Sequence, residues 1–505
     1  MRTNRPLRKT AVTRRNTNAV ALNKPRMYGC ASLDKPPVCP GKPEACPTGN
    51  RTPHSPPRYD EQMSASQPAL RRELRLWHLV LFNISAVAGV RWLAAAAHSG
   101  PGSLSLWLLA AVAFFLPSAL VVSSLSARFP EEGGFYVWTK RAFGDWHGFL
   151  AAWVYFVSNI FYFPTLLLSG VAMASYMFGQ TGVKYSENPA YAIPVTVAGL
   201  LLAFFVNLIG LRFGKWPGLL GGITSYLVAG LLCVFGILVV WRYGSATHFN
   251  FIPEASWGNF NFWSQIALAM TGLELAPILG GEIHDPDRNI PRAAWISGLG
   301  CATFYMAGTA AMLAILPPDR ISAMTGLAQA GEAVGTRFGA NWLSTCFAVL
   351  ITVGVVGQLS TYIAGNTRLP YAIGLDHYLP AAFAKLHPRW HTPHVSIVTQ
   401  AVLSTLFLLL AELGENLRAA YQILVDMVVI ATLIPFVYIF ASGFKFGRRI
   451  SGIAGGAIAV LAIILSAVPP PGVASAWLFE LKVIGGTILL ALVGRVIFVR
   501  SKGVK

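Results

Sequence analysis

Charged side chains are scarce in this sequence. Asp, Glu, Lys and Arg make up 12% of its 505 residues, whereas 54% are hydrophobic and the mean hydropathy is +0.54. Because a soluble domain carries about 25% charged residues, the composition excludes an ordinary soluble protein and predicts an integral membrane protein. The apolar runs reach about 20 residues, which indicates helices rather than a β-barrel.

Cysteine pairs and catalytic motifs are also lacking. The six cysteines form no C-x-x-C pair and have no zinc-ligand spacing, so we expect reduced thiols without a disulfide framework. No G-x-S-x-G, H-E-x-x-H or Walker sequence is present. A membrane enzyme should show such a constellation. We therefore expect neither an enzyme nor a metal site nor a cofactor.

Acidic residues are the scarcer charge, and the formal net charge is +18. Residues 1–58 hold twelve Lys/Arg against only Asp34 and Glu44. Residues 1–70 are poor in apolar runs and predict a disordered basic cytoplasmic tail, while a basic arm that touches anionic lipid is the alternative. The excess of positive charge in a membrane protein concerns topology and lipid, and we expect no nucleic acid as a partner.

The remainder, residues 71–500, predicts a single all-α membrane domain of twelve transmembrane helices. Loops on the side of the termini hold thirteen Lys/Arg against six on the opposite side, which predicts that both termini are cytoplasmic, in an inner or plasma membrane. The predicted spans are 77–97, 103–127, 147–177, 190–211, 216–241, 260–281, 294–316, 341–373, 394–412, 419–443, 449–468 and 478–499.

Two of these spans have the same interruption at matching depth. Gly89 lies 12 residues after Trp77, and Gly272 lies 12 residues after Phe260. Each distance is about 18 Å of helix, which places both glycines near the middle of a core about 30 Å thick. Because the sixth span follows the first by five positions, an odd number, the two enter from opposite sides. We therefore predict two inverted five-helix repeats, about 77–241 and 260–443, followed by two extra helices, about 449–499.

In both spans the glycine precedes an ionisable residue by two positions. Charge at this depth is costly and by default marks a functional site, and glycine-interrupted helices at matching positions indicate the binding site of a transporter. The alternative is that both glycines are close-packing positions in intact helices. The predicted substrate-binding residues are Ala88, Gly89, Val90, Arg91 and Trp92 in the first span, and Thr271, Gly272, Leu273 and Glu274 in the sixth.

The roles of the two charged residues stay open at this point. Arg91 and Glu274 could form an ion pair across the site, either as a structural pair or in the empty state. Alternatively, Arg91 could bind a substrate carboxylate, and Glu274 could bind an amine or carry a proton. Trp92 could gate the site or cover a cation. In the third span, Asn159 and Tyr162 are candidates for the substrate path, with packing as the alternative.

Three further segments carry a family resemblance. Residues 130–136 read Pro-Glu-Glu-Gly-Gly-Phe-Tyr and are followed by Arg-Ala-Phe-Gly at 141–144. Residues 282–293 contain Glu282, Pro286 and Ile-Pro-Arg-Ala, and 368–372 read Arg-Leu-Pro-Tyr-Ala with Leu-Pro at 379–380. In this order, over about residues 73–445, they resemble signatures of the amino acid–polyamine–organocation (APC) superfamily.

The resemblance implies a LeuT-like fold, alternating access, and substrate binding at the breaks of spans one and six. The family's first break is usually Gly-x-Gly, whereas in this sequence the second small residue is replaced by Arg91. Backbone alone is therefore not expected to hold the substrate carboxylate. Residues of the loop signatures are expected to form the gate and loop structure, in which a carboxylate paired with a basic loop residue could hold the inner side shut: Pro130, Gly133, Gly134, Glu282 and Pro291.

Ion coupling has three candidates. Sodium-coupled members of the fold place adjacent hydroxyls in span eight, where Ser360 and Thr361 stand, although such hydroxyls often bond their own helix. Some proton-coupled relatives use a basic residue in span five, but Lys215 stands only at its beginning. Glu274 is the preferred proton carrier, and exchange without an ion is also open.

The sequence therefore predicts a secondary active transporter that moves a small molecule, an amino acid or a related amine, across the lipid bilayer. A channel should lack paired breaks at inverted depth. A polyamine transporter of the same fold and a substrate-sensing transceptor are the alternatives. Arg91 opposes a polycation, while Glu274 and Trp92 suit one.

Overall fold

The computed structural model describes residues 72–502 except 180–181, 183, 186–187, 254–256, 412–416, 470–476 and 478–479. They belong to one compact unit, Gln67–Lys505. The predicted tail, 1–70, and Cys30, Cys39 and Cys46 lie outside the described residues. The other three cysteines, Cys233, Cys301 and Cys346, are free thiols.

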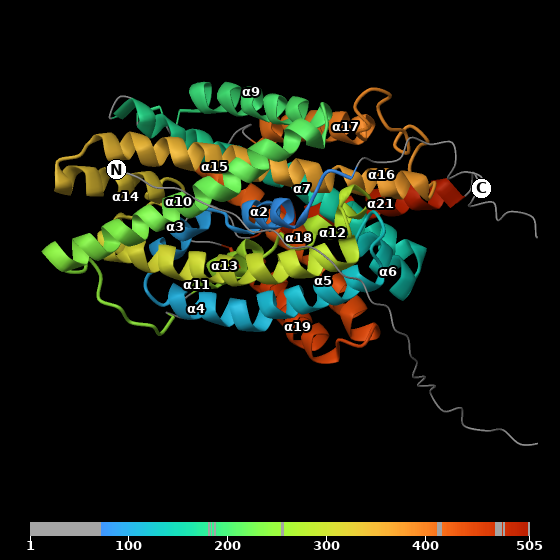
Figure 1. The fold of residues 1–505 in the computed structure, drawn as a ribbon, viewed down its shortest axis with the longest axis horizontal. Coiled ribbons are helices and arrows are strands. Elements are labelled where there is room, and N and C mark those ends of the chain that lie inside the picture. Colours follow the sequence, from blue (N-terminus) through green and yellow to red (C-terminus); the bar gives the residue numbers. More distant parts are fainter. Residues whose placement is uncertain are drawn as a thin grey trace, which may run out of the picture. The chain divides into compact units, whose positions relative to one another are not determined.

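The described residues form helices joined by short connections, which confirms the predicted all-α class (Figure 1). Apart from helices, one isolated parallel bridge joins Leu74 to Ile283 in these residues. The helices are α2 (Leu76–Val87), α3 (Arg91–His98), α4 (Ser103–Ala110), α5 (Leu116–Arg128), α6 (Phe135–Phe143), α7 (Asp145–Ala174), α9 (Pro189–Leu208), α10 (Leu211–Tyr243), α11 (Trp257–Ala269), α12 (Leu275–Ile278), α13 (Pro286–Ile315), α14 (Gly326–Phe338), α15 (Trp342–Asn366), α16 (Arg368–Leu375), α17 (His394–Ala411), α18 (Leu417–Lys445), α19 (Arg449–Ser466) and α21 (Gly486–Lys502). Single turns of 3₁₀ or π geometry are η1 (Ala111–Phe115), η2 (Ser175–Phe178), η3 (Gly280–Glu282), η4 (Pro318–Arg320) and η5 (Leu481–Gly485).

Nine helical segments in the described part of the chain are long and apolar enough to cross a membrane. They coincide with nine of the predicted spans. The predicted span 394–412 corresponds to a shorter apolar helix, His394–Leu409, and span 260–281 is divided between α11 and α12. The predicted total of twelve remains a prediction, because the last span includes residues outside the described ones.

The most deeply buried helices of the bundle are α7 and the broken pair α2–α3. The apolar window of α7 is 100% buried and that of α2–α3 is 83% buried, whereas those of α9 and α19 are 33% buried. Helices α10, α13 and α15 pack on α2, which lies among them in Figure 1. Large apolar side chains on the outer helices are exposed, as expected for a surface that faces lipid.

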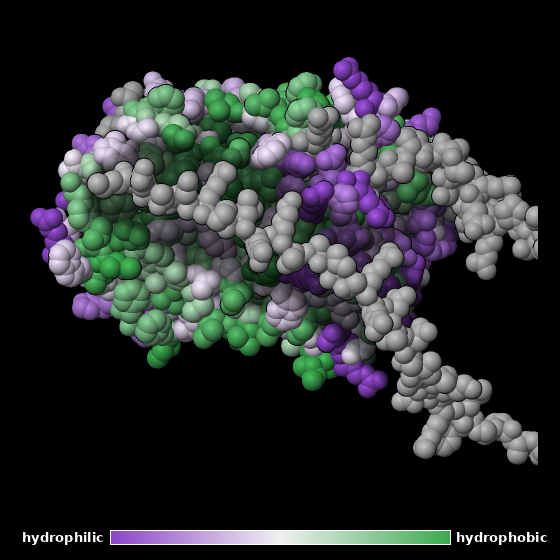
Figure 2. All heavy atoms as spheres, in the orientation of Figure 1, coloured by the Kyte–Doolittle hydropathy of each residue, from purple (hydrophilic) through white to green (hydrophobic). Residues whose placement is uncertain are grey.

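Hydrophilic residues gather toward one end of the unit, where Figure 1 places α6 and α16, while apolar residues cover most of the rest of the visible face (Figure 2). This end carries Lys140, Arg141 and Arg368. It is therefore the end that the charge distribution predicts to be cytoplasmic.

Glycines allow α10 and α15 to approach each other at backbone distance. A Cβ on Gly221 would lie 2.6 Å from the Cα of Gly357, closer than real side chains come.

A Gly221→Ala variant should therefore lose about 1–3 kcal/mol of stability through overpacking. Thermal unfolding in detergent measures this loss. Gly230→Ala on the same helix is the control, because nothing lies within 4 Å of that position; equal midpoints for the two variants would contradict the close packing.

Candidate functional site

The first span is broken where the sequence predicts it. Helix α2 ends at Val87 and α3 begins at Arg91, with Ala88, Gly89 and Val90 between them. A Cβ on Gly89 would lie 2.8 Å from Trp92 Cδ1 and 3.1 Å from Gln358 Nε2. A side chain at this position would therefore displace Trp92, which lies beside Arg91.

The sixth span is broken over Met270–Glu274, between the end of α11 and the start of α12. Gly272 has φ +130°, a conformation that favours glycine. A Cβ there would lie 2.9 Å from Val87 Cγ2 and 3.0 Å from the carbonyl carbon of Ala86. The two breaks therefore pack directly against each other in the centre of the bundle.

A single hydroxyl bridges the two breaks. Tyr305 of α13 accepts a hydrogen bond from the Gly89 N–H at 3.1 Å, and its oxygen lies 3.0 Å from the Ala269 carbonyl and also contacts the Val87 carbonyl. The hydroxyl can give its one proton to either carbonyl. The Trp107 ring stacks on the Tyr305 ring with centroids 4.3 Å apart and fixes its position.

Other side chains bond further backbone carbonyls beside the breaks. Gln358 of α15 donates from Nε2 to the Ala86 carbonyl at 3.0 Å, and Thr271 donates from Oγ1 to the Leu268 carbonyl at 2.7 Å. The broken helices are thus held by side chains of the protein itself. This meets the requirement that polar backbone groups at membrane depth find partners.

Arg91 is buried at the first break without a full set of partners. It is 2% exposed, and its Nε and Nη1 have no hydrogen-bond partner in the structure. Its guanidinium carbon lies 4.4 Å from the Trp92 ring centroid and 5.0 Å from that of Tyr162. The two rings stabilise the cation but leave donors without acceptors.

Glu274, in contrast, has a partner for each carboxylate oxygen. It is 1% exposed; Oε1 accepts from the Tyr155 hydroxyl at 2.6 Å, and Oε2 accepts from the Gly272 N–H at 2.7 Å. The ion pairs of the described residues do not include Arg91 with Glu274. The ion pair offered as one alternative from the sequence is therefore not formed in this structure.

The structure brings together some, but not all, of the other predicted residues. Tyr162 stacks beside Arg91 and lies 4.7 Å from the Tyr362 ring, measured between centroids. Asn159 donates to the Tyr155 carbonyl at 2.9 Å and to Asn366 at 3.3 Å, while its Oδ1 has no partner. Asn366 in turn donates to Gln400 at 2.9 Å, so these amides join α7, α15 and α17. Ala88, Val90 and Leu273 are buried in the core.

The adjacent hydroxyls of span eight have different partners. Ser360 donates to the Gly214 carbonyl at 3.1 Å and accepts from Asn207 at 3.0 Å. Thr361 lies 3.1 Å from the Ser85 hydroxyl of α2 and donates to the Gly357 carbonyl of its own helix at 3.0 Å. The Lys215 side chain pairs with Glu73 at 3.3 Å.

A buried ion pair closes the end of the bundle that is predicted to be cytoplasmic. Arg368 Nε lies 2.8 Å from Glu282 Oε1, and both side chains are nearly inaccessible to solvent. The Glu282 carbonyl accepts from the N–H groups of Glu73 and Leu74 at 2.9 and 3.1 Å. The chain before α2, the end of span six and α16 are therefore joined at one point.

A second carboxyl group, Glu132, is inserted beside this ion pair. It lies in the loop before α6, outside the membrane-spanning helices; its Oε2 accepts from the Gly281 N–H at 2.7 Å, and its buried Oε1 has no partner. Burial and the neighbouring Glu282 carboxylate raise the pKa of Glu132 to about 8. The group is therefore mostly protonated at neutral pH.

Sequence reasoning assigned no role in holding the breaks together to the residues that do so: Tyr155, Tyr305 and Gln358. Each is a polar side chain in an otherwise apolar span, and Gln358 is the clearest example. Because a polar group at this depth needs a partner, lone polar residues in apolar runs are a signal that could have indicated them. The signal does not say which residue is the partner.

Comparisons with known proteins agree with this architecture. The family profile described as amino acid permease matches residues 74–477. An uncharacterized transporter of Legionella pneumophila is 27% identical over 84% of this chain and 96% of its own. A serine/threonine exchanger of Bacillus subtilis is 24% identical over 75% and 85%, and a probable agmatine/putrescine antiporter of Lactococcus lactis is 20% identical over 85% and 96%.

Among solved structures, that of MhsT in complex with L-phenylalanine resembles this one. The TM-score is 0.55 at 12% sequence identity, over 85% of this chain and 100% of that one. At this identity the likeness concerns the fold alone. It confirms the LeuT-like arrangement that the sequence motifs imply.

The bridging hydroxyl is testable by its removal. Tyr305→Phe removes the donor to the Ala269 carbonyl and one of the two acceptors of the Gly89 N–H, which keeps its bond to the Val87 carbonyl. Loss of the buried bond to Ala269 should cost about 1–3 kcal/mol of stability. Thermal unfolding of the purified protein measures it. The control is Tyr243→Phe, whose hydroxyl bonds the Arg337 carbonyl near the surface and should change stability by less than about 0.5 kcal/mol. Equal effects would refute a special role for the bridge.

The buried Glu132 predicts a pH dependence. A carboxyl whose pKa is about 8 in the folded protein and about 4.3 when unfolded holds its proton more tightly in the folded state, so folding stability falls as pH rises between these values. The unfolding midpoint of the wild type should therefore fall relative to that of Glu132→Gln from pH 5 to 8 and then run parallel to it. Glu131→Gln, at an exposed position paired with Arg141, should show no such divergence. A constant difference for Glu132→Gln across this range would contradict the prediction.

Proposed function

The chain belongs to the amino acid permease family, and from this premise we propose that it moves an amino acid across the membrane by alternating access. The substrate binds where the broken helices meet, between the α2–α3 and α11–α12 breaks. The chain is a multi-pass membrane transporter; the amino acid as its substrate and the residues below are the proposal.

One observation carries the proposal: the buried guanidinium of Arg91 has donors without acceptors. An ionised group at this depth is costly unless it is paired. A substrate carboxylate supplies two acceptor oxygens in the geometry that a guanidinium binds bidentately. Arg91 is also the first residue of α3, so its charge adds to the positive end of that helix dipole.

Glu274 serves as the proton carrier in this proposal. In its ionised form it accepts bonds from Tyr155 of α7 and from Gly272 within the break. A protonated carboxyl has one oxygen that donates, so at least one of these two bonds must rearrange. Protonation at Glu274 would thereby change the contact between α7 and the broken span. Sodium at Ser360 and Thr361, or exchange without an ion, are the alternatives for coupling.

Two other functions compete with amino acid transport. A polyamine transporter is supported by the relative named a probable agmatine/putrescine antiporter. The free cation of Arg91 in the site opposes a polycation, whereas it suits an amino acid and suits an acidic one best. A transceptor would bind substrate without moving it. We place the protein in an inner or plasma membrane with both termini cytoplasmic, as the loop charges indicate.

Uptake by purified protein in liposomes tests the proposal. With labelled amino acids and polyamines offered under imposed proton or sodium gradients, an amino acid should accumulate. Arg91→Ala should reduce its uptake by about a hundredfold or more, since it removes a charge-assisted bidentate bond. Arg91→Lys should retain only part of the wild-type uptake, because an ammonium group lacks the planar fork.

Glu274→Gln should abolish accumulation driven by a proton gradient, while exchange of substrate across the membrane continues.

The outcomes separate the alternatives. Normal transport by both Arg91→Ala and Glu274→Gln would leave the site to backbone groups and contradict the proposed roles of both side chains. Uptake of a polyamine alone would show that the substrate class is wrong, although the fold would stand. Saturable binding without uptake would favour the transceptor.

A further inference from the structure

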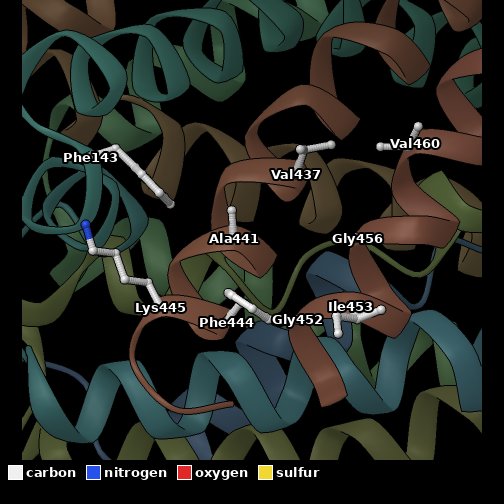
Figure 3. Close-up of a pocket in the computed structure, with 9 residues that line it drawn as sticks. All are labelled: Phe143, Val437, Ala441, Phe444, Lys445, Gly452, Ile453, Gly456 and Val460. Carbon is white, nitrogen blue, oxygen red and sulfur yellow. The ribbon is translucent and has the colours of Figure 1, made fainter. Parts of the chain in front are cut away.

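A groove opens on the outer surface of the bundle, between α18 and α19, with Phe143 at the end of α6 beside it (Figure 3). Its volume is about 460 Å³. Val437, Ala441 and Phe444 of α18 form one wall, and Ile453 and Val460 of α19 form the other. Its lining is apolar except for Lys445, so it suits a hydrocarbon occupant.

Glycines make the groove possible. Gly452 and Gly456 belong to its lining on α19 and leave space where side chains would stand. A Cβ on Gly452 would lie 2.8 Å from Phe444 Cβ, so this glycine already packs against α18 of the same chain. Gly456 is different, because its nearest neighbour would be Phe440 Cβ at 3.6 Å. A side chain at Gly456 would therefore extend into the groove without displacing α18.

The groove has the depth of one leaflet. From Arg449, where α19 begins, to Val460 the helix rises about 16 Å at 1.5 Å per residue. Half of a hydrocarbon core about 30 Å thick is about 15 Å. A chain that enters at the α18–α19 connection and runs to Val460 would thus cover one half of the bilayer.

Cations stand at the entrance of the groove. Lys445, Arg448 and Arg449 lie at the α18–α19 connection, are exposed, and belong to no ion pair among the described residues. Lys445 donates one of its protons to the Ala142 carbonyl and has two others. The sequence has no Asp or Glu between Asp426 and Glu480 that could neutralise them.

We propose that this groove is a binding site for one anionic phospholipid of the cytoplasmic leaflet. An acyl chain lies between α18 and α19, and the phosphate is bound by Lys445, Arg448 and Arg449. Apolar shape, leaflet depth and charge complementarity at one end agree on this occupant. A second copy of the chain fits less well, because Gly452, the first glycine of the Gly-x-x-x-Gly pattern on α19, is covered by α18.

Native mass spectrometry of the full chain, released from bilayers that contain phosphatidylcholine and phosphatidylglycerol, tests the site. The wild type should retain one phosphatidylglycerol in preference to phosphatidylcholine. Arg448→Gln and Arg449→Gln should each weaken this retention about fivefold. Gly456→Leu should abolish it by filling the groove.

Matched controls separate the site from a general basic surface. Lys385→Gln and Arg389→Gln remove cations from another loop of the same side, and Gly230→Leu adds a leucine on α10, where nothing lies within 4 Å. All three should retain the lipid as the wild type does. Equal retention of both lipids by the wild type, or equal loss in controls and site variants, would overturn the proposal. So would a dimer that Gly456→Leu converts to monomer, because the groove would then be an interface. The measurement needs no substrate, so it stands apart from the transport assay.

Discussion

The structure depends on the requirement that backbone groups of two broken helices find partners far from water. Tyr305 of α13 and Gln358 of α15 meet it, and neither belongs to a broken helix. Because their bonds reach carbonyls on α2 and α11, the positions of four helices are fixed relative to one another by two side chains. These bonds also leave fewer free backbone groups for a substrate to bind, because the Ala86 and Ala269 carbonyls at the ends of the half-helices already have donors.

The side-chain groups at the breaks that lack a hydrogen-bond partner therefore indicate what a substrate could bind. At the breaks, Glu274 has a partner for each oxygen, whereas Nε and Nη1 of Arg91 have none. An ion pair between the two would have removed this asymmetry and left a site with no charge to offer. Without it, the centre of the bundle presents a cation between the rings of Trp92 and Tyr162. This charge is the basis of our proposal that the site takes a carboxylate rather than an amine.

The sequence was sufficient to locate the breaks, because glycine two positions before a charge in a long apolar run has few other meanings at membrane depth. The sequence was also sufficient for the all-α class, because apolar runs of about 20 residues have the length of membrane-spanning helices. It could not supply the partners of the breaks. Tyr305 meets the Gly89 N–H, and Tyr155 meets Glu274, through the packing of helices. The composition of an apolar helix does not specify how it is rotated against its neighbour. Asn159 illustrates the limit: the sequence proposes it for the substrate path, but only the structure shows that its amide donates to the Tyr155 carbonyl and to Asn366.

The break of span six and the closure of the inner end belong to one short segment. Glu282 follows Glu274 by eight residues, and α12 and η3 fill the interval. Along this segment the Ile278 carbonyl accepts from the Gly133 N–H at 3.1 Å, and a Cβ on Gly280 would lie 2.8 Å from the Glu131 carbonyl oxygen. Such close contacts leave the segment little freedom to bend independently of the loop before α6. A rearrangement at Glu274 that moved α12 would therefore reach the Glu282–Arg368 pair as well, so the substrate and proton sites that we propose at the centre would be mechanically connected to the closure of the inner end.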